Sequence, residues 1–210
     1  MSKYVMETDG NLPAPGSIFT GKERKYSDIK GIGVSDAHIY SGRLEKLCNY
    51  TNTFFHQEPY WDVTKPSPIN DADFIISTDV FEHTPAPSEA PFKPVYDALK
   101  PGGKLFVSVP THIEYIEHFP DMHNYQVVEL TDGDFVLVNR TADDELEVFD
   151  HLRFHGGPGT TLEMRIYSIE KFEENLRDAG FQNIERVTDF PNEFGVYDIP
   201  YMTTLWVAEK

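Results

Sequence analysis

The sequence predicts an α/β fold, an open and mainly parallel sheet that carries an antiparallel β insertion. Three observations support this class: buried-type strands alternate with helical segments, residues 73–110 have the pattern strand, helix, strand, and residues 111–165 break the alternation. The 210 residues suffice for a full hydrophobic core. We therefore expect a single domain over 1–210, with an irregular lead-in over 1–27 and an insertion or lid over 111–165.

Composition excludes several classes of partner. The formal net charge is −17, whereas binding to nucleic acid or to an anionic membrane needs a basic surface. The single cysteine, Cys48, excludes an intramolecular disulfide, and no apolar run approaches the ~20 residues of a membrane span. The first ten residues lack the apolar centre of a signal peptide. We expect a cytoplasmic protein that binds neither nucleic acid nor membrane; the oligomeric state stays open.

The first half of the chain predicts two strands and a helix. Residues 30–36 (KGIGVSD) are typical of a short buried strand that ends in polar residues. Residues 51–56 are β-branched and aromatic, which favours a strand. Between them, residues 37–48 have helical spacing that places three apolar side chains near one face: Ile39, Leu44 and Leu47.

The clearest pattern covers residues 73–110. The run DFIIST over 73–78 is typical of a strand buried on both faces of a parallel sheet. Ser88 is a candidate cap for a helix that ends near Leu99, and residues 100–104 (KPGGK) predict a sharp turn. Residues 105–109 then form a second buried strand, so that a βαβ unit results.

The rest of the chain predicts an antiparallel insertion and a closing α/β segment. Residues 125–130 and 135–140 flank a TDGD turn, and residues 146–149 add a third strand. Beyond the insertion, Ser168 caps a helix that reaches Ala179 and stops at Gly180, and strands follow over 183–188 and 203–208.

Two segments taken together resemble a known superfamily. The segments DFIISTDVFEH (73–83) and LKPGGKLFVSVP (99–110) resemble the fourth and fifth strands of class I S-adenosylmethionine-dependent methyltransferases of the small-molecule type. The segments YTNTF (50–54) and FHGGPG (154–159) are similar to a bacterial group of methyltransferase-like proteins associated with glycan assembly. The resemblance implies a Rossmann-like sheet and S-adenosyl-L-methionine as the cofactor.

The resemblance also implies which residues bind the cofactor. In this superfamily an acidic residue after the second strand holds the ribose, and another after the third strand faces the adenine. Asp36, preceded by Ser35, falls at the first position, and Asp62, followed by Val63, falls at the second. A carboxylate suits a ribose diol because it accepts two charge-assisted hydrogen bonds. The strand end Ser77-Thr78 is expected to border the methyl donor.

The glycine-rich loop of the superfamily is absent or degenerate in this chain. The segment Tyr4–Gly10 is the upstream candidate and holds one glycine, whereas Gly31 and Gly33 lie inside a predicted strand. If residues 30–36 were the first strand, Glu58 would become the ribose acid, four residues before Asp62. That spacing is too short for an intervening helix, so residues 30–36 are assigned to the second strand.

The resemblance implies transfer of a methyl group to a hydroxyl of a small molecule or sugar. Asp79 and His83 fall where substrate and methyl donor would meet, and His83 or His155 is the candidate general base. Two other function classes stay open. One is a catalytically silent module that binds a glycan, nucleotide or protein partner, because the cofactor loop is degenerate. The other is a metal-dependent enzyme.

The metal alternative rests on a histidine-rich insertion. The spacings match no standard motif, so no metal is expected, and histidines that only satisfy hydrogen bonds are the simplest interpretation. The residues that would form such a site are His118, Asp121 or His123 with His151 or His155.

Overall fold

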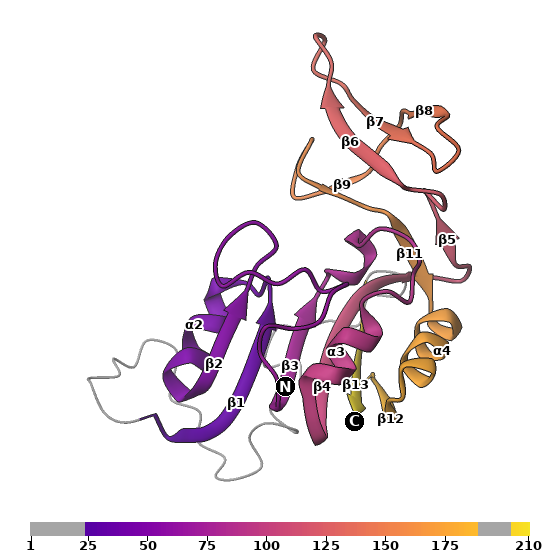
Figure 1. Ribbon diagram of the computed structural model, residues 1–210. Helices are drawn as coiled ribbons and strands as arrows, with labels where there is room; N and C mark the ends of the chain where they lie inside the picture. The colour runs from indigo at the N-terminus through magenta and orange to yellow at the C-terminus, as the bar shows by residue number, and fades with distance from the viewer. Residues whose placement is uncertain (1–23, 189–202) are drawn as a thin grey trace.

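The computed structural model describes residues 24–188 and 203–210, which form a sheet flanked by helices and an antiparallel extension (Figure 1). The main sheet has the strand order β12-β13-β4-β3-β1-β2, and the short strands β11 and β5 continue from β4. The predicted class, an α/β sheet with an antiparallel insertion, is confirmed. The strands of the main path are β1 (Tyr26–Val34), β2 (Cys48–Thr53), β3 (Ala72–Thr78), β4 (Leu99–His112), β12 (Gln182–Val187) and β13 (Thr203–Glu209).

The strands β1 to β4 run parallel to one another, and β13 and β12 close the sheet antiparallel. The carboxyl ends of β1, β2, β3 and β4 therefore lie along one edge. In open α/β sheets ligands bind outside these ends. The candidate residues that follow β1 and β3 consequently share an edge.

The two faces of the sheet have separate cores because side chains alternate along each strand. On one face Ile32, Ile75 and Leu105 pack with the helices α3 (Phe92–Ala98) and α4 (Ile169–Ala179). On the other face α2 (His38–Leu47) contributes Tyr40 and Leu44, which pack on a second set of buried residues: Cys48, Tyr50, Phe74, Ile76, Phe106 and Val207. Among the described residues, no helix is both long and apolar enough to cross a lipid bilayer.

The structure contradicts the assignment of residues 30–36 to the second strand. β1 pairs with β2 on one side and with β3 on the other. In a doubly wound sheet the first strand lies between the second and the fourth, so β1 is in the first strand's place. Hydrophobic pattern identifies a strand but not its neighbours. The candidate strand at Tyr4–Gly10 lies outside the described residues, as does most of the predicted lead-in.

No third strand lies between β2 and β3 in this part of the described chain. Residues 54–71 form a loop with one isolated bridge, Phe54 to Tyr60, and this loop crosses from β2 to the opposite side of β1. Trp61 and Val63 fill the place of a crossover helix, because both are buried in the core beside Ile32. Glu58 and Asp62 therefore lie in one loop, and the short spacing that excluded Glu58 is no obstacle.

The helix predictions are confirmed in type, with corrected ends. α4 is capped by the Ser168 hydroxyl, which accepts from the Lys171 amide, and ends at Gly180 with a φ of 108°. α3 begins at Phe92 instead of after Ser88, whose carbonyl and hydroxyl instead bond Tyr167 and Asn175. In α2 the prediction that Ile39 faces the core is wrong, because this residue is 78% exposed.

The insertion forms its own small antiparallel layer, as predicted. β6 (Asn124–Glu129), β7 (Phe135–Arg140) and β8 (Leu146–Phe149) make a meander that projects beyond the carboxyl edge of the main sheet (Figure 1). The chain returns through the short pair β9 (Phe154–His155) and β10 (Thr161–Leu162), then β11 (Arg165–Ser168), which pairs with β5 (Ile116–Glu117) and β4. A separate core holds this layer together: Phe119, Leu137, Leu162 and Met164.

Candidate active site

The predicted cofactor residues lie at the carboxyl ends of β1 and β3 and in the loop after β2. Ser35 is exposed and has a φ of 57°, so the turn after β1 has a left-handed backbone of the kind that glycine adopts most readily. Ser77 pairs with Val34 across the strands, and its buried hydroxyl has no hydrogen-bond partner in the described residues. An exposed turn beside an orphaned hydroxyl fits a polar cofactor that passes close to the backbone.

Asp36 contacts tyrosines instead of facing solvent. Its side chain is 4% exposed, and its two carboxylate oxygens accept hydrogen bonds from Tyr40, at 2.9 Å, and from Tyr50. Tyr40 also bonds the Thr78 hydroxyl at 2.9 Å, which links the ends of β1 and β3. Burial raises the pKa of Asp36 from 3.8 to about 7, although both tyrosine hydrogen bonds oppose the shift. A ribose bound by Asp36 would have to displace a tyrosine hydroxyl.

The glycines before Asp36 serve this packing. A Cβ atom at Gly31 would overlap the rings of Phe74 and Tyr50, and one at Gly33 would overlap the Tyr50 hydroxyl and the Asp36 carboxylate. The Gly-x-Gly pattern inside β1 therefore makes room for aromatic side chains of neighbouring strands.

We expect Asp36→Asn to stabilise the fold increasingly as pH rises from 5 to 8. A carboxyl with a raised pKa stays protonated in the folded state while the unfolded chain ionises, so wild-type stability falls with pH over that range. Asparagine keeps an oxygen acceptor and removes the charge. The difference in free energy of unfolding between variant and wild type should grow by roughly 2–4 kcal/mol, measured by urea denaturation at both pH values.

Tyr50→Phe provides a directional control for this prediction. The Tyr50 hydrogen bond stabilises ionised Asp36, so its loss should move the pH midpoint of the stability change upward. Parallel stability curves for wild type and Asp36→Asn would contradict the raised pKa.

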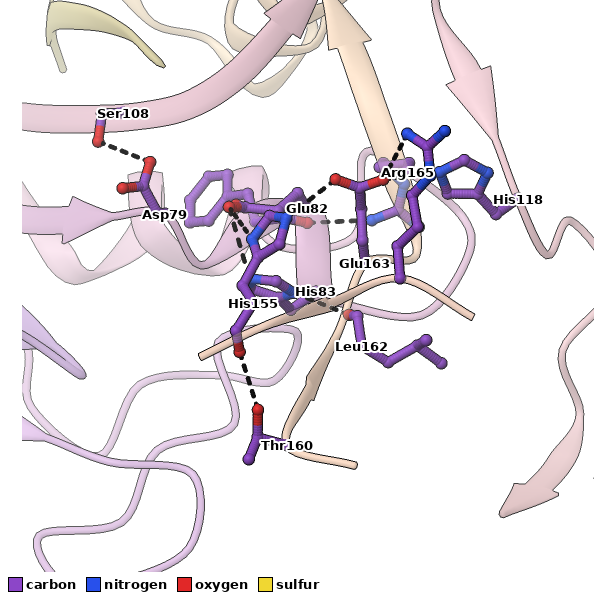
Figure 2. A network of polar contacts seen from close by, with 12 residues as sticks. Asp79, Glu82, His83, Ser108, His118, His155, Thr160, Leu162, Glu163 and Arg165 are labelled. Atoms are coloured by element: carbon purple, nitrogen blue, oxygen red, sulfur yellow. Dashed lines mark hydrogen bonds and ion pairs between the residues drawn. The ribbon is translucent and has the colours of Figure 1, made fainter. Parts of the chain in front are cut away.

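The residues after β3 lie at the same edge. Asp79, which has a φ of 54°, accepts a hydrogen bond from the Ser108 hydroxyl of β4 at 3.2 Å, and its amide donates to the Ser108 carbonyl. A short 3₁₀ helix, η1 (Phe81–His83), follows and places Glu82 and His83 side by side (Figure 2). Glu82 is fully buried and His83 is mostly buried.

The insertion folds back onto η1 and brings His155 to it. The Met164 amide donates to the Glu82 carbonyl at 2.9 Å, and the His83 ring donates from Nδ1 to the Leu162 carbonyl at 2.7 Å. The rings of His83 and His155 meet edge to face with centroids 4.7 Å apart. Segments more than seventy residues apart in the sequence thus form one cluster, shown in Figure 2.

Glu163 holds the two insertion histidines. Its carboxylate accepts from His118 Nε2 at 3.0 Å and from His155 Nε2 at 2.9 Å (Figure 2). Because Nε2 of His155 donates to the carboxylate, Nδ1 is the ring nitrogen that can act as an acceptor. That nitrogen lies 3.7 Å from Glu82 Oε1.

Comparison with known proteins identifies the family. Residues 22–186 match the model of the methyltransferase domain, which is more than half of the 210 residues. This chain belongs to the methyltransferase domain family. The class I superfamily resemblance is confirmed, and with it S-adenosyl-L-methionine as the cofactor, whereas the glycan-associated subgroup stays a prediction.

Individual relatives agree with this family. The methyltransferase is 27% identical over 182 residues to a protein of Bacillus subtilis (strain 168) named as a methyltransferase, YqeM, covering 82% of this chain and 72% of the relative. An S-adenosylmethionine-dependent methyltransferase from Mesorhizobium loti superposes with a TM-score of 0.55 at 15% identity, over 90% of this chain and 94% of that one. The sugar N-methyltransferase KedS8 from Streptoalloteichus sp. ATCC 53650 gives 0.51 at 13% identity, over 87% and 80%. These structures show the shared Rossmann-like fold.

In this methyltransferase the predicted catalytic residues lie close together, whereas the residues of the predicted metal site are separated. Asp79, His83 and His155 lie around Glu82 (Figure 2), whose pKa is raised mainly by burial and further by the charges of Asp79 and Glu163. His118 and His155 meet at Glu163. The others do not join them: Asp121 and His123 are exposed beside Asn139, and the His151 side chain is 94% exposed.

Three residues of the site were missed in the sequence: Glu82, Glu163 and Arg165. Each is buried, and Arg165 is fully buried on β11. For Glu163 and Arg165 the sequence contained a signal. Both lie in the segment TLEMRIY between apolar residues, and charged side chains in such a segment are rarely buried without partners. Burial also sets protonation here: it raises the pKa of Glu82 to about 8 and lowers that of His83 to about 4.

Proposed function

We propose that this methyltransferase transfers a methyl group from S-adenosyl-L-methionine to a hydroxyl oxygen of a small molecule or sugar. The observation that carries the proposal is the position of His155: its Nε2 bonds the Glu163 carboxylate, and its Nδ1 lies 3.7 Å from Glu82 Oε1, near Asp79 (Figure 2). An oriented imidazole with a free lone pair suits removal of a hydroxyl proton. His83 donates from Nδ1 to a carbonyl and has a lowered pKa, so it serves to position His155.

The cofactor supplies an electrophilic methyl group. Ser35, Ser77 and Thr78 would border it at the ends of β1 and β3. Asp62 would meet the nucleoside, because its loop leaves β2 at the same edge and its Oδ1 already fixes a tight turn at Thr64. Val63 is buried in the core, so its backbone would serve the ring. We assign the ribose to Asp62 or Glu58, and Asp36 to holding the β1 turn.

The insertion would act as a lid that carries the acceptor specificity. Its return segment supplies His155 and Glu163. On β6, burial raises the pKa of Tyr125, and the charge of Asp62 in the cofactor loop adds to this shift. A lid that contributes catalytic groups couples substrate enclosure to assembly of the site. The strongly negative chain favours a neutral or cationic acceptor over an anionic one.

Calorimetric titration with S-adenosylhomocysteine tests the cofactor site. We expect micromolar binding by wild type. Asp62→Ala should bind at least about tenfold more weakly, the effect of losing about one charge-assisted hydrogen bond. For Asp36→Asn the affinity should change by less than about threefold. The tyrosine contacts of Asp36 are the reason for the contrast.

The outcomes separate the proposals. A tenfold loss for Asp36→Asn with unchanged Asp62→Ala would restore the ribose role of Asp36. No binding by folded wild type would favour the silent binding module, which the occupied carboxylate of Asp36 supports.

A further inference from the structure

The cluster of Glu82, His83 and His155 contains polar atoms that face one another without forming hydrogen bonds. His83 Nδ1 donates to the Leu162 carbonyl, and His155 Nε2 donates to Glu163. The other nitrogen of each ring lies near Glu82 Oε1, at 3.5 Å for His83 Nε2 and 3.7 Å for His155 Nδ1. Three acceptor atoms converge, and these separations are too long for hydrogen bonds.

Glu82 gives a second and independent observation. Its side chain is 0% exposed, and among the described residues neither carboxylate oxygen has a hydrogen-bond partner. A buried carboxyl group without partners is costly to a fold. One proton on Glu82 would satisfy a contact to only one of the two nitrogens. A cation between the three groups would satisfy all of them.

We propose that Glu82, His83 and His155 bind one divalent transition-metal ion. Two ligands about 2.1 Å from one ion in tetrahedral geometry stand about 3.4 Å apart, close to the two separations observed. All three ligand atoms lie within 4.8 Å of one another, and a shared ion would require about 3.4 Å between the two histidine nitrogens as well. Two imidazoles and one carboxylate favour zinc or iron over magnesium or calcium and leave open positions.

The surroundings match those of metal-binding histidines. Such histidines donate their second ring N–H to a carboxylate or a backbone carbonyl, which fixes the ring and the tautomer. Glu163 and the Leu162 carbonyl fill both roles. Glu163 is itself fixed by His118, so the outer contacts extend through the insertion.

The metal's part in catalysis rests on the proposed function. An open position beside Asp79 would take the acceptor oxygen, and the ion would favour its ionised form, which replaces proton removal by free His155 Nδ1. The acceptor class would then be a hydroxyl with a neighbouring oxygen that completes the coordination.

Metal titration of the purified chain tests the site. Protein stripped with a chelator is titrated with Zn²⁺, and Co²⁺ is added separately to record the absorption of a nitrogen-ligated ion. We expect one Zn²⁺ per chain, with Kd raised at least about a hundredfold by Glu82→Gln and by His155→Gln. His151→Gln is the matched control, since that histidine of the insertion is exposed, and it should bind as wild type does.

A thermal measurement separates ligation from misfolding. In chelator, Glu82→Gln should unfold at the wild-type temperature or above, because an unpartnered buried carboxyl is removed. Zn²⁺ should raise the unfolding temperature of wild type and leave that variant unchanged. Absence of binding by wild type, or equal binding by all variants, would overturn the proposal. Cofactor binding is measured in chelator, so a failed metal titration leaves the methyltransferase proposal standing, and a failed cofactor titration leaves the metal site standing.

Discussion

Arg165→Met should lower the free energy of unfolding by about 3–5 kcal/mol, the loss expected when one member of a buried ion pair is removed. Arg165 is fully buried on β11, and its Nε donates to Glu117 of β5 at 2.8 Å. One terminal nitrogen donates to the Phe81 carbonyl at 3.0 Å and to the Thr84 hydroxyl at 2.9 Å. One side chain thus joins the insertion to η1. Urea denaturation with the slope compared between variants measures the loss.

Two further variants test the cause. Glu117→Gln in the Arg165→Met background should recover part of the loss, because it removes the negative charge that the first change leaves without its arginine partner. Arg140→Met is the matched control: Arg140 pairs with Asp144 on the exposed surface of β7, where an ion pair contributes less than about 1 kcal/mol. Equal losses for Arg165→Met and Arg140→Met would contradict the role of burial.

The local sequence pattern predicted the strands and helices better than it predicted which strands are adjacent in the sheet. The caps of α4 and the meander of 124–149 follow from capping residues, turns and alternation, all of which are local. The position of β1 in the strand order depends on which strands flank it, and the hydrophobic periodicity of one strand does not indicate its neighbours. The loop after β2 was missed for a related reason, since Trp61 and Val63 cover a face where a helix was assumed.

Asp79 and His83 were predictable because they follow a strand, and His155 was predictable because it lies in a glycine-rich segment of the insertion. Asp79 and His83 come directly after β3, so the resemblance of one segment was enough to select them. Glu82 was not selected, because its burial depends on the segment before β11 folding onto η1 from about eighty residues away. Asp36 was correctly placed at a strand end, but its tyrosine partners come from α2 and β2.

In metal-free protein, where His155 Nδ1 is available as the general base, His155→Gln should lower kcat by about 10²–10⁴-fold, the usual contribution of such a base. Glutamine keeps an N–H for Glu163 and removes the lone pair that imidazole Nδ1 directs to Glu82. The affinity for S-adenosylhomocysteine should change less than about threefold, because none of the hydrogen bonds of His155 reaches the cofactor residues at β1. Formation of S-adenosylhomocysteine with an acceptor found by screening hydroxyl compounds measures kcat.

Companion variants separate proton transfer from support of the lid. Glu163→Gln keeps the shape of the side chain but weakens the orientation of His155, so a smaller loss of roughly tenfold is expected. His151→Gln changes an exposed histidine of the same insertion and should keep full turnover. If His155→Gln reduced kcat and cofactor affinity equally, His155 would act by holding the insertion closed, and the acceptor proton would have to leave by another group at this edge, of which Asp79 is the nearest to the end of β3.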